Sequence, residues 1–155
     1  MLTISQASTL KAVALADVTA AALLNGGNDT GLAEWFNTAQ THVVWRSSLT
    51  PELARAAIIQ GASQLDALTV GKRDSLFYLA SGSLNTTNPA VRAALDDLCG
   101  TQTQLKGYLQ AAQKRTANRA EKALSTGSGT DASPATLGWE GVISSNEASA
   151  IREAA

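Results

Sequence analysis

The chain has 155 residues, of which 45% are hydrophobic and 5% aromatic, and its formal net charge is −1 at pH 7. That length suits one domain burying about two thirds of its unfolded surface, but so much of the apolar content is alanine that we expect a thin core, completed in part by neighbouring subunits. The near-neutral charge gives no general affinity for nucleic acid or a membrane, and the single cysteine, Cys99, excludes an intrachain disulfide and a multi-cysteine metal site.

The first fifty residues predict three short helices and then an extended segment. Candidate N-caps are, in chain order, Ser5 or Ser8, then Asp17, then Asp29 or Thr30. The segment 41–49, THVVWRSSL, has β-branched residues beside a tryptophan and is predicted to be extended.

Residues 50–124 predict further short helices. Prolines at the first helical position mark two helix starts, at Thr50-Pro51 and Asn88-Pro89. The other candidate caps are Thr69, Thr103 and Thr116, and the expected stops are Gly61, Gly82 and Gly100. We therefore predict a mainly α fold, a bundle of about seven short helices over residues 1–124, with Cys99 packed on an apolar helix face.

The pattern changes after Leu124. Residues 125–143 begin with a run of small residues and glycines that predicts a loop or extended arm, followed by a short β segment around TLGWEGVI. Ser144 and Glu147 have the spacing of a capping box, which predicts a last helix within 144–155. Because the arm is bracketed by structure, we expect its far end to dock.

Side chains suited to catalysis are sparse, so we expect no enzymatic activity, catalytic residue, cofactor or metal. His42 is the only histidine and would have to combine with one of many serines. The neighbours Asp96 and Asp97 point about 100° apart on a helix and do not share a site. The glycines of STGSGTD lack the lysine and the preceding strand of a phosphate-binding loop.

Two groups of residues are candidate interaction sites. The first is basic: Lys114, Arg115, Arg119 and Lys122. If one helix runs through Thr116, then Arg115, Arg119 and Lys122 fall at helical spacing and form a face for DNA phosphates or an acidic partner such as a portal surface. The alternative is a solvated helix face.

The second group surrounds Trp139, beyond the small-residue run. This tryptophan either folds back onto its own domain or fills a pocket on a neighbour, where tryptophan is a favoured anchor. The partner-binding residues predicted on the second interpretation, in which the arm adds a strand to another chain, are Thr136, Leu137, Trp139, Val142 and Ile143.

Three stretches resemble a family encoded among the virion-structure genes of tailed bacteriophages: THVVWRSSLT, LDALTVGKRDSLFYLASG and, most specifically, KRTANRAEKALSTGSGTDASPATLGWEGVIS. The resemblance implies a virion component made in the host bacterial cytoplasm. Among such components, small helical subunits with a protruding segment resemble head–tail connector (adaptor) proteins. These form a homo-oligomeric ring under the portal, in contact with portal or tail proteins and potentially with packaged DNA.

Two other classes remain open. A capsid decoration or tail-attachment protein would use the same arm with different symmetry, and a small helical enzyme or host-directed regulator would be a monomer with a pocket near His42. No run of about 18 apolar residues and no signal-peptide pattern is present, so we expect no membrane partner.

Overall fold

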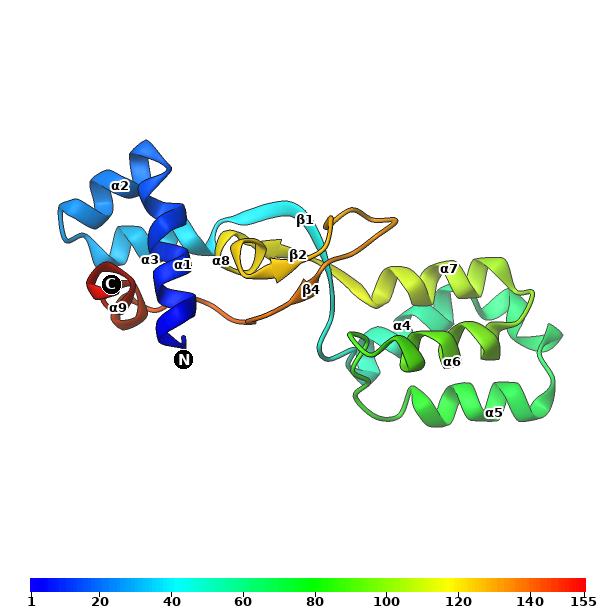
Figure 1. Cartoon of the computed structure of the whole chain (residues 1–155). Coiled ribbons are helices and arrows are strands. Elements are labelled where there is room, and N and C mark those ends of the chain that lie inside the picture. The colour runs from blue at the N-terminus through cyan, green and yellow to red at the C-terminus, as the bar shows by residue number, and fades with distance from the viewer. The chain divides into compact units, whose positions relative to one another are not determined.

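The computed structural model describes residues 1–155 and is mainly α-helical, as predicted, with nine α-helices, one 3₁₀ helix and four short strands (Figure 1). The chain divides into two compact units. Unit 1 comprises residues 1–44 and 116–155, and unit 2 comprises residues 45–115. These bounds differ from the expected helical domain 1–124 with a separate arm 125–143 and terminal helix 144–155, because both ends of the chain pack together in unit 1.

Unit 1 contains five helices drawn from both ends of the chain. They are α1 (Ile4–Leu15), α2 (Val18–Asn25), α3 (Asp29–Asn37), α8 (Arg119–Ala123) and α9 (Ser145–Glu153). The predicted caps Asp17 and Ser144 are confirmed, the latter in a capping box with Glu147. The other two starts were predicted too late, because Thr3 caps α1 and Asn28 caps α3.

The core of unit 1 is formed by residues far apart in sequence. Helix α9 packs on α1 and α3, and α2 packs on both α1 and α3. Leu10, Leu32 and Phe36 are fully buried there together with Ile143 and Ile151. The C-terminal helix is therefore part of the N-terminal helical core.

The strands form two small sheets. Strands β1 (Ala39–Trp45) and β2 (Lys114–Asn118) make one, and β3 (Ser125–Thr126) pairs antiparallel with β4 (Thr136–Leu137) in the other. The chain leaves unit 1 at the end of β1 and re-enters it within β2. The extended segment around THVVW is confirmed, whereas the β segment expected over TLGWEGVI shortens to β4. Gly141, at φ +147°, has a backbone conformation that suits glycine and not a regular strand.

Unit 2 contains the contiguous middle of the chain. Its elements are α4 (Pro51–Gln60), the 3₁₀ helix η1 (Ala62–Ala67), α5 (Val70–Leu79), α6 (Pro89–Cys99) and α7 (Thr103–Ala112). The caps Thr50, Thr69 and Asn88 are confirmed, while Thr103 lies inside α7 and η1 was not predicted.

The helices of unit 2 pack in the order α4, α7, α6, α5. Leu49, Ile58, Leu76, Leu95 and Leu105 are buried in its core, with Cys99 packed among them as predicted. Gly61, at the end of α4, lets that helix lie close to α7, since a β-carbon at Gly61 would lie 2.7 Å from Cδ1 of Leu105. No single helix of the chain has both the length and the hydropathy to cross a bilayer; α1 and α2 reach both only in sum, and the chain bends by 118° between them.

Candidate functional site

The loop that follows β3 lies along β1 of its own unit. The amide of Val43 donates to the carbonyl of Gly129 (2.8 Å), and the amide of Ala135 donates to the carbonyl of Val43 (2.9 Å). Thr130 and Ser133 close the loop with reciprocal backbone bonds of 3.2 Å. The small-residue run is therefore a folded loop within unit 1, and it is not a projecting arm.

His42 supports this loop from β1. Its Nε2 lies 2.9 Å from Oγ of Ser125, and that hydroxyl donates to the carbonyl of Lys122 (2.8 Å). A hydroxyl carries one proton, so Nε2 of His42 is the donor in this arrangement and cannot act as a base toward Ser125. Burial, with Lys122 nearby, lowers the pKa of His42 below its ordinary value, so the imidazole is held neutral.

A buried carboxylate holds the segment 138–143. Glu121 is buried, and it accepts hydrogen bonds from the amides of Asn118 and Gly141, both at 3.1 Å. The side chain of Asn118 in turn accepts from the amide of Glu121 and donates to the carbonyl of Gly141, both at 2.8 Å. The capping box of α8 thus also fixes a turn that is 20 residues further along the chain.

The predicted partner-binding residues divide between the interior and the surface. Ile143 is only 2% exposed in the core of unit 1, and its amide and carbonyl both bond the side chain of Asn37 at 2.8 Å. Trp139 and Leu137 are half-buried against unit 1. Thr136 and Val142 are exposed, Val142 by 71%. In this structure Trp139 therefore folds back onto its own unit.

The condition for a single basic helical face is not met, because residues 114–118 are strand β2. The predicted helix start at Thr116 is too early, since α8 begins at Arg119. Asn118 is the better start, since its side chain and that of Glu121 satisfy the first amides of α8. Lys114 and Arg115 thus precede α8 in a strand, with Lys114 Nζ 6.0 Å from the centroid of the Trp45 ring.

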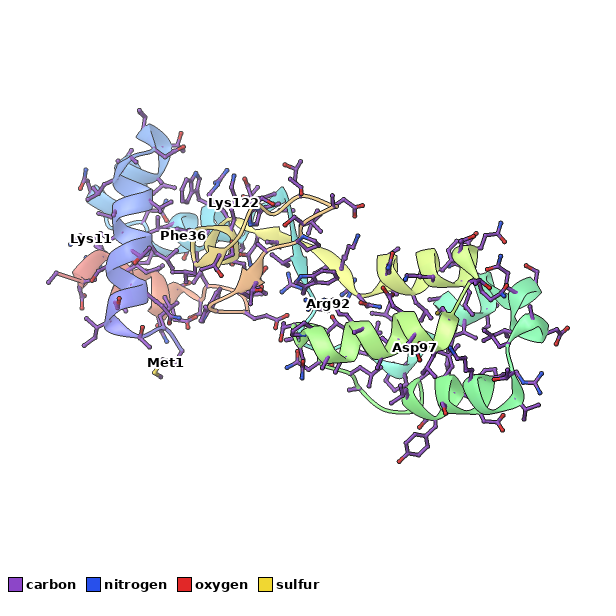
Figure 2. All side chains as sticks on the ribbon, turned by 45° about the vertical axis from the view of Figure 1, so that its right-hand side comes forward. Met1, Lys11, Phe36, Arg92, Asp97 and Lys122 are labelled. Carbon is purple, nitrogen blue, oxygen red and sulfur yellow. The ribbon has the colours of Figure 1, made fainter.

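Arg119 and Lys122 are brought together beside Trp35. The guanidinium of Arg119 lies 4.0 Å from the centroid of the Trp35 ring and donates to the Trp35 carbonyl (2.9 Å). Lys122 is exposed on α8 (Figure 2). Both line an open pocket of about 400 Å³ whose wall includes Val13 and Asp17. The pocket therefore combines the positive charges of Arg119 and Lys122 with the carboxylate of Asp17 and an apolar contact on Val13.

The remaining reactive side chains are held apart. Asp96 accepts from Gln110 and pairs with Lys106 (3.1 Å), whereas Asp97 pairs with Lys72 (3.7 Å), so the two carboxylates do not share a site, as predicted. Burial raises the pKa of Cys99 to about 11, which keeps its thiol protonated. No group of three or more His, Cys, Asp or Glu side chains is arranged to hold a metal ion.

Sequence reasoning missed the two contacts that organise this region. Asn118 and Glu121 have capping-box spacing, so the signal for the buried Glu121 was present. The stacking of Arg119 on Trp35 had no such signal, because 84 residues separate the two. No family model, curated protein or solved structure matches the chain.

Proposed function

We propose that this chain is a structural subunit of a tailed-phage virion, a head–tail connector (adaptor) protein that forms a ring under the portal. The stretches that resemble virion-structure proteins support the proposal. The most specific of these stretches, residues 114–144, forms the hydrogen bonds that join the start of α8 to the turn at Gly141.

The observation that carries the proposal is the exposure of large apolar side chains on the helices of both units. Val18 is 90% exposed on α2, Tyr78 79% on α5 and Ile59 72% on α4. Each of these side chains offers apolar area that a neighbouring subunit can cover. Because Ile143 packs in the core of unit 1 and Trp139 packs against that core, these exposed side chains are better candidates for contact with neighbours than residues 125–143.

The pocket beside Trp35 gives the connector a second potential contact. Lys122 lies at its edge and is exposed, so an acidic portal surface or DNA phosphates can approach it. Arg119 contributes positive charge there while its stacking on Trp35 fixes its position. Substitution of Lys122 by Glu should therefore weaken portal or DNA binding and leave the fold intact.

The test is binding of the full-length chain to separated virion parts of its phage. Native mass spectrometry and negative-stain imaging would follow the chain alone and mixed with portal, capsid shells or tail tubes. A closed ring of copies on the portal is the expected result, weakened in Lys122→Glu. Binding to capsids or tail tubes instead would assign the chain to decoration or tail attachment, and binding to none of the three would contradict a virion function.

A further inference from the structure

An acidic, apolar groove runs between α5 and α6 of unit 2. It has a volume of about 570 Å³, and its apolar lining comes from Tyr78 and Leu79 of α5 and from Ala94 and Leu98 of α6. Asp74 and Asp97 also line it, and Asp97 is marked on α6 in Figure 2. Asp97 is balanced by Lys72, whereas Asp74 is exposed and forms no ion pair. The groove thus offers apolar surface with one uncompensated negative charge.

The outer face of α4 has the complementary character. Glu52, Arg55, Ala56 and Ile59 are all exposed and follow one another at helical spacing, opposite the buried Ala54, Ala57 and Ile58. Ile59 projects a large apolar side chain, and Ala56 beside it leaves room for close approach. Arg55 is exposed, with the carboxylate of Glu52 near enough to interact with its charge, so this face presents one large apolar side chain and a cation beside an anion.

We infer that the α4 face of one copy of this chain docks in the α5–α6 groove of a second copy. Ile59 would enter the groove beside Tyr78 and Leu98, and Arg55 would approach Asp74. This inference rests on the proposed function, in that a ring subunit must contact its neighbours. The pairing is argued from charge and apolar complementarity between two faces that are otherwise uncovered.

The two faces cannot satisfy each other within one chain. Helix α4 packs on α7, α7 on α6 and α6 on α5, so the α4 face and the groove belong to opposite ends of this packing order. A contact between two different surfaces is heterologous, and repetition of it builds a closed ring or an open filament rather than a symmetric dimer. If the rotation between successive copies closes, this contact builds the ring of the proposed function.

Mixing of two single variants tests the inference in the full chain. Ile59→Glu removes the inserted side chain but leaves the groove, and Ala94→Glu fills the groove but leaves the α4 face. Sedimentation at up to about 1 mM chain would follow association. We expect wild type to form large assemblies, each variant alone to associate about thirtyfold more weakly, and their mixture to stop at one-to-one dimers. Val70→Glu, on an exposed face of α5 outside the groove lining, is the matched control and should assemble as wild type does.

The charge pair gives a second, independent measurement. Arg55→Asp and Asp74→Arg should each weaken association, and the double variant should recover it. A monomeric wild type at every concentration would overturn the inference, as would variants that assemble normally or a mixture that gains nothing. These results need no portal, so a chain that self-associates in this way but binds no virion part contradicts only the proposed function.

Discussion

The core of unit 2 draws only on residues 49–109, whereas the core of unit 1 combines residues 7–36 with residues 120–151. In unit 2, successive helices such as α5, α6 and α7 pack on one another. In unit 1, α9 packs on helices more than 100 residues earlier, and the bonds between Asn37 and Ile143 span 106 residues. Two units that are both built from short helices therefore differ in how much of the chain must be in place before they are stable.

Each unit contains an arginine stacked on a tryptophan, but the two pairs join different parts of the chain. In unit 2, the guanidinium of Arg92 lies 4.1 Å from the Trp45 ring centroid, and its Nη1 donates to the carbonyls of Thr86 and Thr87. In unit 1, Arg119 and Trp35 belong to the two separate segments of the unit. The same kind of contact thus lies within one continuous segment in unit 2, and it holds the N-terminal segment to the C-terminal segment in unit 1.

The largest expected effect is the loss of stability when one buried side chain is truncated in each unit, and it should be confined to the unit that carries the substitution. Phe36→Ala in unit 1 should cost about 3–5 kcal/mol, and Leu105→Ala in unit 2 about 2–5 kcal/mol, since both side chains are fully buried. Hydrogen exchange followed by mass spectrometry measures the effect by segment. Phe36→Ala should expose residues 1–44 and 116–155 together, and Leu105→Ala should expose residues 45–115. If α9 stays protected in Phe36→Ala, the two segments of unit 1 do not form one cooperative core.

The difference between contacts near in sequence and contacts far apart in sequence also explains which features could be predicted. The starts of α4, α5 and α6 were predicted at the correct residues, because Thr50, Thr69 and Asn88 are local capping signals. In unit 1 the caps Asp17 and Ser144 were found for the same reason. A proline directly follows the caps Thr50 and Asn88, and Glu147 completes the capping box of Ser144. The capping box of Asn118 and Glu121 is an equally local signal, but it was missed because the start was placed at Thr116.

What could not be predicted depends on distant partners. The loop 127–135 has the composition of a flexible arm, and its order comes from the backbone of Val43 and from the ring of His42. Trp139 is half-buried only because both chain ends meet in unit 1. The basic residues had helical spacing, but β2 pairs with β1 and ends the helix, so tertiary pairing outweighed local propensity.

Two glycine-to-alanine substitutions, one in each unit, should change the free energy of unfolding in opposite directions. Gly129 has φ +65°, and a β-carbon there would overlap the ring of His42. Gly129→Ala should therefore cost about 1–3 kcal/mol from backbone strain, with displacement of the loop from β1 in addition. Gly107 lies within α7 with nothing near its missing side chain, so Gly107→Ala should stabilise by about 0.5–1 kcal/mol. Chemical denaturation of each variant measures both, and a neutral Gly129→Ala would show that the loop is not held against His42.

The smallest expected effect is a pH dependence confined to unit 1, which holds the only histidine. Because the pKa of His42 is lowered from 6.5 in the folded chain, the unfolded chain binds more protons just below that pH. The stability contributed by neutral His42 is therefore fully present above pH 6.5 and is lost as the pH falls through the lowered folded value. Glu147 and Glu52, whose pKa values are lowered from 4.5, lose their contributions only at lower pH.

His42→Gln is the variant that isolates this term, because the glutamine amide can still donate to Ser125 and does not titrate. Urea unfolding of both chains between about pH 5 and pH 8 should show a decline on acidification in wild type that is absent from the variant. Hydrogen exchange at the same pH values should place the decline in residues 1–44 and 116–155. An equal decline in both chains would assign it to other groups, and a decline within residues 45–115 would show that unit 2 responds to protonation in unit 1, so that the two units are less independent than their separate cores indicate.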